Sequence, residues 1–244
     1  MVDLSSFEIH RSLSPGIWSE NNEIDSEVRE RLVEIATDFY ENLDLGAEIL
    51  DITLTGSLAN YNWSKYSDVD LHLIVDFEEI NEDEEMVRQL VDSLKTVWNR
   101  VHDITIKGYD VEVYIQDKDQ PHHSGGLYSL MNDEWISVPE KDVKKFDPGV
   151  VEKKSKSLMG QINFCHQMLK EGKYDDAIDA CNFLKEKIRK MRKAGLEKDG
   201  EFSNENIVFK VLRREGFLEK LQDTKVRAYD LKMTITEVLN RRKK

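Results

Sequence analysis

The chain has 244 residues, 39% of them hydrophobic, and a net charge of −13, so it can bury one large core or two smaller ones. Its 12 glycines and four prolines exclude a fibrous or low-complexity protein, and no apolar run is long enough to span a membrane. The N-terminus lacks the basic and apolar regions of a secretory signal. Two cysteines cannot form a disulfide framework, so we expect a cytoplasmic protein.

The charge is distributed unevenly along the chain. Residues 151–244 contain 23 basic and 15 acidic side chains, a net charge of +8, whereas residues 1–150 contain 12 basic and 33 acidic ones, a net charge of −21. This change predicts two parts that have different roles or that attract each other. Because an acidic chain repels phosphate, we expect no strong non-specific DNA binding.

The first part of the chain alternates between helical and strand patterns. Residues 1–24 have little periodicity and predict an irregular arm. From Asp25 to Leu43, apolar residues recur every three or four positions, which predicts a helix. A second helix is expected behind the acidic turn at residues 81–84. Strands are expected at residues 48–55, 68–77 and 109–116, followed by a hairpin of residues 127–130 and 135–138 around Asn132-Asp133.

The strand signals stop at Asp147-Pro148, a pair that favours the start of a helix. Helical periods follow, and Cys165 and Cys181 fall on their apolar faces, where we expect small core residues rather than nucleophiles. The expected helices lie around residues 158–169, 177–191, 207–212 and 217–239. The sequence therefore predicts an α/β (α+β) protein: a core with a small mixed sheet over residues 1–147, then an all-helical part over residues 148–244.

A Gly-Ser turn at the end of the first predicted strand is the first chemical signal. Gly56 lacks a Cβ, so a phosphate can approach the backbone closely. We expect a short helical stretch at residues 58–63, whose first N–H groups, with the Ser57 hydroxyl, would hold a triphosphate. Lys65 follows in the loop, and the pattern fits a phosphate contact and a solvated lysine equally well.

Acidic residues on two predicted strands are the second signal. Asp68 and Asp70 lie two apart on one strand and point to the same face. Neighbouring carboxylates are unfavourable without a cation between them, and oxygen-only ligands favour Mg²⁺ or Mn²⁺. Asp110 and Glu112 share the polar face of another strand, and the mid-strand position favours Glu112 as the third ligand, with Asp110 as the alternative. Three such carboxylates match a two-metal site for phosphoryl displacement.

These motifs together resemble the DNA polymerase beta-like nucleotidyltransferase superfamily, which combines a Gly-Ser turn, an Asp-x-Asp strand and a later acidic strand. The resemblance covers about residues 46–116. The sequences of segments 56–73 and 109–117 (YDVEVYIQD) are similar to those of nucleotidyltransferases of tailed bacteriophages. The resemblance implies nucleotide binding by Gly56 and Ser57 and metal binding by Asp68, Asp70 and Glu112. For the helical part, the resemblance to that superfamily is limited to its being helical.

The resemblance implies an enzyme that transfers NMP from an NTP, expected to be ATP, to a hydroxyl acceptor and releases pyrophosphate. The acceptor stays open between a protein side chain, an RNA end, a small molecule and another nucleotide. Two other interpretations are a non-catalytic nucleotide-binding regulator, such as an antitoxin-like partner, and an RNA-binding module that uses the basic residues of 185–193 and 241–244.

Three weaker signals have a structural and a functional interpretation. His72 shares a predicted strand face with the aspartates, and a hydrogen-bonded core histidine is favoured over a partner of the metal site. His122-His123 favours an exposed loop over a metal site because no cysteine is near. Tyr61 and Trp63 would either stack a base or pack the short helix.

Overall fold

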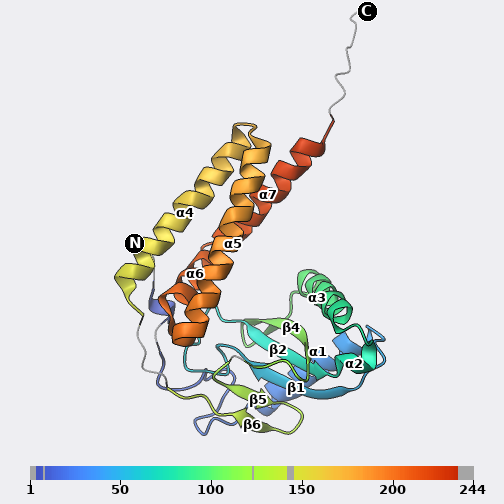
Figure 1. Cartoon of the computed structure of the whole chain (residues 1–244). Coiled ribbons are helices and arrows are strands. Elements are labelled where there is room, and N and C mark those ends of the chain that lie inside the picture. The colour runs from blue at the N-terminus through green and yellow to red at the C-terminus, as the bar shows by residue number, and fades with distance from the viewer. Residues whose placement is uncertain (1–3, 8, 123, 142–145, 236–244) are drawn as a thin grey trace, which may run out of the picture. The chain divides into compact units, whose positions relative to one another are not determined.

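A computed structural model of the chain describes residues 4–7, 9–122, 124–141 and 146–235. The chain divides into two compact units, residues 5–143 and residues 144–244, and Leu4 groups with the second. Figure 1 shows a sheet with helices in the first unit, whereas the elements described in the second unit are helices only. The predicted fold class, a mixed sheet followed by an all-helical part, is therefore confirmed. The division falls close to the boundary expected at residue 147.

Local capping explains where the helices of the first unit begin. Helix α1 (Ser26–Glu41) starts after Asp25, whose side chain accepts a hydrogen bond from the Val28 N–H. Asp83 caps α3 (Glu84–Val101) in the same way, after the single turn of α2 (Phe77–Ile80). No helix in the described part of the chain is long and apolar enough to cross a bilayer.

The described residues of the expected irregular arm are irregular in backbone and include the 3₁₀ turn η1 (Ser5–Phe7) and a bridge between Trp18 and Ile24. It is nevertheless part of the core, because Leu13, Ile17 and Trp18 are at most 4% exposed. Burial of these three side chains holds the segment on the sheet without any helical or strand period.

Six strands form one mixed sheet in the order β3-β4-β2-β1-β5-β6. The strands are β1 (Ile49–Thr55), β2 (Val69–Val75), β3 (Thr105–Ile106), β4 (Tyr109–Asp117), β5 (Leu127–Ser129) and β6 (Glu134–Ser137). Only β2 and β4 pair in parallel; the other pairs are antiparallel. The α3 helix connects the two parallel strands, as such a crossover requires. The very short β3 has no clear signal in the sequence.

The sheet has one apolar and one polar face. Val69, Leu71, Leu73 and Val75 alternate inward along β2 and are fully buried. They belong to one core cluster with residues of α1 and α3, so these helices cover the apolar face. The opposite face carries the polar residues that alternate with them, and the candidate site lies on this face.

The described part of the second unit contains α4 (Pro148–Lys170), α5 (Tyr174–Asp199), α6 (Asn204–Arg214), α7 (Phe217–Met233) and the 3₁₀ turn η2 (Gly200–Phe202). The Asp147 side chain caps α4 and Pro148 is its first residue, as predicted. The end expected for the last helix, residue 239, lies outside the described residues.

Cys165 and Cys181 are 2% and 1% exposed in the second unit. Burial raises the pKa of both thiols, to about 12 for Cys181. Both therefore stay protonated near neutral pH, which confirms their prediction as small core residues rather than nucleophiles.

Candidate active site

Gly56 brings the backbone of the Gly-Ser turn against a carboxylate. β1 ends at Thr55, and Gly56 follows with a φ of +75°, which other residues adopt only with strain. A Cβ at this position would lie 1.8 Å from Oδ2 of Asp70 and 2.8 Å from its Cγ. The turn therefore meets the Asp70 carboxylate so closely that a side chain at position 56 would displace it.

The helical stretch expected at residues 58–63 is wrong. The chain forms successive turns here, and Leu58 and Ala59 are fully buried. The backbone is held from outside the segment, because the Leu58 carbonyl accepts a hydrogen bond of 2.7 Å from the Trp18 indole and the Tyr61 carbonyl accepts one from the His10 N–H. Burial and these contacts outweigh local helix formation, so the expected anion site at a helix start is not present.

Ser57 and Lys65 lie in the same turn region. The Ser57 hydroxyl is 2.7 Å from the Ser67 hydroxyl, a contact that closes the loop between β1 and β2. Lys65 is exposed, and its Nζ lies 4.9 Å from the centre of the Tyr66 ring. This environment fits the solvated-lysine interpretation, and a phosphate contact of Lys65 stays a prediction.

The sheet register places the predicted acidic residues of two neighbouring strands next to each other. Asp70 is the in-register neighbour of Thr55 on β1 and of Glu112 on β4, so all three lie on one face. Asp68 lies just before β2 and is half-buried, like Asp70 and Glu112. Asp110, in contrast, is exposed and is the register partner of Thr105 on β3. The register thus places Glu112, not Asp110, beside Asp70.

The three carboxylates share a face but do not gather around one point. Glu112 accepts a short hydrogen bond from the Tyr114 hydroxyl, whereas the Asp70 carboxylate lies against Gly56 on the other side of β2. Among the described residues, no three His, Cys, Asp or Glu side chains form a group that could hold a metal ion. The oxygen donors and their common face suit a divalent cation. To complete such a site, Glu112 would have to turn from Tyr114 toward Asp70.

The polar face also carries His72 and three side chains without an assigned role, Gln116, Tyr114 and Lys95. The imidazole of His72 is 2.7 Å (Nδ1) from Oε1 of Gln116 and stacks on Tyr114 with ring centres 4.8 Å apart. Lys95 of α3 places its Nζ 4.7 Å from the centre of the Tyr114 ring. The two-residue period of β4 places Tyr114 on the same face as Glu112, whereas the position of Lys95 over its ring has no signal in the sequence.

His72 is confirmed as a hydrogen-bonded, half-buried histidine. Burial lowers the pKa of His72 to about 4, against the opposite effect of the Gln116 hydrogen bond and with a further decrease from the charges of His122 and Lys95. The imidazole is therefore neutral at neutral pH. Since Oε1 of Gln116 can only accept, Nδ1 of His72 donates this hydrogen bond.

The remaining predicted residues have structural roles where they are described. Tyr61 is 9% exposed, and Trp63 stacks on His10 with ring centres 3.9 Å apart and donates to the Ser12 carbonyl. Both rings thus pack against the protein. His122 is exposed, as expected for a loop, while His123 and the basic residues 241–244 lie outside the described residues.

Comparison with known protein families found no match, and comparison with curated proteins found none either. Among solved structures, a similar chain is a STING-associated CdnE c-di-GMP synthase from Capnocytophaga granulosa. It is 16% identical, the alignment covers 86% of this chain and 84% of that chain, and the TM-score is 0.24. Because a TM-score this low supports no argument, the function has to be inferred from the residues of this chain.

Proposed function

We propose that this chain is a metal-dependent nucleotidyltransferase that transfers NMP from an NTP to a hydroxyl group and releases pyrophosphate. The observation that supports the proposal is the row across three strands: the Gly56 turn, Asp70 and Glu112 lie on one polar face, next to Asp68. Residues from three distant segments share this face, as the Gly-Ser, Asp-x-Asp and acidic-strand motifs of the resembled superfamily would require.

Each residue has a role that follows from its position. The turn at Gly56 would present its backbone to the triphosphate beside the Asp70 carboxylate, and the Ser57 hydroxyl would exchange its contact with Ser67 for a phosphate oxygen. Asp68, Asp70 and Glu112 would hold Mg²⁺ or Mn²⁺, and such an ion would supply charge neutralisation for the triphosphate and a lower pKa for the attacking hydroxyl. The hydroxyl oxygen attacks the α-phosphorus, the bond to the β-phosphate oxygen breaks, and the hydroxyl proton passes to solvent.

Tyr114 positions Glu112 in this proposal. The Tyr114 hydroxyl donates to the Glu112 carboxylate, so Glu112 stays hydrogen-bonded until a nucleotide and its cation arrive. Turning Glu112 toward Asp70 would then complete the set of oxygen ligands formed by Asp68, Asp70 and Glu112. We expect ATP as the donor, and the acceptor is a protein side chain, an RNA end, a small molecule or a second nucleotide.

Pyrophosphate release is the direct test. The protein is incubated with each NTP and Mg²⁺, alone and with RNA or protein acceptors, and α-labelled NTP reports where the NMP goes. We expect release with at least one NTP, and a loss of at least about 100-fold in the double variant Asp68→Asn/Asp70→Asn, since metal ligands contribute several kcal/mol to such transfers.

Asp110→Asn is the matched control, because it removes an exposed carboxylate from the same strand as Glu112. Glu112→Gln should abolish release, whereas Asp110→Asn should leave it unchanged. Equal release by the double aspartate variant and the unmodified protein would refute the proposal. NTP binding without turnover would instead favour the nucleotide-binding regulator.

A further inference from the structure

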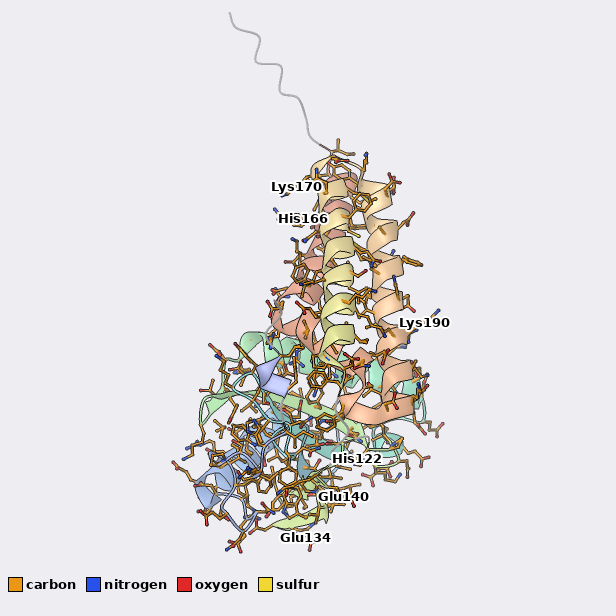
Figure 2. All side chains as sticks on the ribbon, turned by 90° about the vertical axis from the view of Figure 1, so that its left-hand side faces the viewer. His122, Glu134, Glu140, His166, Lys170 and Lys190 are labelled. Atoms are coloured by element: carbon orange, nitrogen blue, oxygen red, sulfur yellow. The ribbon has the colours of Figure 1, made fainter. Side chains whose placement is uncertain are left out.

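A group of basic side chains lines one seam of the helical unit, between α4 and α7. His166 and Lys170 lie one turn apart on α4, and Figure 2 labels both. Nδ1 of His166 is 3.2 Å from the hydroxyl of Thr224 on α7, and Thr224 is 1% exposed. Lys220 and Arg227 lie four residues before and three residues after Thr224, on the same face of α7.

Contacts hold two of these side chains, His166 and Lys220, in place. Nζ of Lys220 lies 2.6 Å from Oδ1 of Asn163, one turn before His166 on α4, and 5.7 Å from the centre of the Phe217 ring. Burial lowers the pKa of His166, and the charges of Lys170, Lys220 and Arg227 lower it further. Each of the three permanent cations lies within about one turn of His166 or of its partner Thr224, so the helix geometry brings them near one imidazole.

Several other cations of the helical unit pair with a carboxylate. Such pairs join Lys154 to Glu205, Lys156 to Glu152, Lys173 to Glu171, Arg189 to Glu186 and Lys232 to Asp175. Within the described residues, Lys170, Lys220 and Arg227 form no ion pair, not even with Asp223, the acidic residue that lies between the latter two on α7.

We propose that His166, Lys170, Lys220 and Arg227 form a binding site for phosphate groups of a polyanion, separate from the nucleotidyl-transfer residues. Like charges held side by side are unfavourable unless an anion offsets them. Three permanent charges require a multivalent anion, and the guanidinium and ammonium groups match phosphate oxygens. The phosphates belong either to a free polyphosphate, such as that of a nucleotide, or to an RNA backbone.

The full-length protein can be titrated with tripolyphosphate while the ring signals of ¹³C-labelled histidines are followed by NMR. We expect the His166 signal to shift with saturation and the other histidine signals to change less. The triple variant Lys170→Gln/Lys220→Gln/Arg227→Gln should bind about tenfold more weakly for each cation removed, because each charged hydrogen bond contributes on that order. Binding should also weaken at high salt.

The matched control is Lys153→Gln/Lys156→Gln/Lys198→Gln, which removes the same charge from exposed positions of α4 and α5. It should bind tripolyphosphate like the unmodified protein. Equal weakening in both triple variants, no shift at His166, or equally tight binding of a poly-glutamate peptide would overturn the proposal.

Two further measurements keep the test decisive. In the protein without anion, Lys170→Gln should raise the pKa of His166, and an unchanged pKa would contradict the arrangement. ATP and a ten-residue RNA are then titrated separately. Tighter binding of either one than of tripolyphosphate supports the phosphate site and identifies the source of its ligand.

Discussion

At the scale of single residues, Gly56 carries the strongest structural constraint of the candidate site. Its backbone has a left-handed φ, and the place of a side chain is occupied by the Asp70 carboxylate. A Gly-Ser pair is common in sequences. Only the structure shows that glycine is favoured at position 56 for two reasons, its backbone conformation and its contact with Asp70. The contact couples the turn proposed to bind phosphate to a proposed metal ligand.

The substitution Gly56→Ala tests both constraints, the left-handed backbone and the contact with the Asp70 carboxylate. We expect a loss of NMP transfer of about 100-fold or more, because Asp70 has to move from a Cβ at 1.8 Å and a metal ligand is thereby displaced. The backbone strain alone costs about 1–2 kcal/mol of unfolding free energy. Transfer rates and urea unfolding measure the two effects.

Gly108→Ala is the control for strain. Gly108 has a φ of +87°, and no atom lies within 4 Å of the place that a Cβ would take, so it should lose a similar unfolding free energy from strain but no transfer activity. If both variants transfer NMP equally well, the proposed closeness of the turn and the metal site is wrong.

At the scale of elements, strand β4 depends on helix α3 for its outer edge. β3 covers only the start of β4, and beyond it the Asn99 side chain donates to the Val113 carbonyl and accepts from the Val113 N–H, both at 3.0 Å. The amide thus takes the place of a neighbouring strand and protects an open edge. Glu112 precedes Val113, so the same two hydrogen bonds also support the part of β4 that carries Glu112.

Asn99→Ala should lower the unfolding free energy by about 1–2 kcal/mol, since two backbone hydrogen bonds are lost at a half-buried edge. Thr96→Ala on the same helix is the control, because its hydroxyl bonds only to the Asp92 carbonyl, and it should change the free energy by less than about 0.5 kcal/mol. Amide exchange of Val113, measured by NMR, should accelerate only in the first variant. Unchanged exchange would disprove the role of Asn99.

At the scale of the whole molecule, the change of charge along the sequence coincides with a change of architecture. The acidic segment forms the sheet unit and the basic segment forms the helical unit. The helical unit has its own buried residues, among them Leu158, Ile162, Leu184 and Ile188. A chain of this length can bury enough apolar surface to be stable alone.

We therefore expect the isolated segment of residues 146–235 to fold. Its circular dichroism should be helical and its thermal unfolding cooperative. Cys165 and Cys181 should react with a thiol reagent at pH 8 far more slowly than in guanidinium, because both thiols are buried and protonated. The full-length chain serves as the reference. Immediate reaction of both thiols, as in denaturant, would show that the unit needs the rest of the chain.

The sequence by itself determined most elements of this protein and their faces. Periods of two and 3.6 residues, with Asp25 and Asp147 as helix caps, are local, so strands β1, β2 and β4 and the long helices were predictable. The tertiary structure alone decided the turns at residues 58–63, the bond between Tyr114 and Glu112, and the pairing of Glu112 with Asp70. These depend on a parallel register between strands more than 30 residues apart and on burial against distant segments, and no local pattern encodes either.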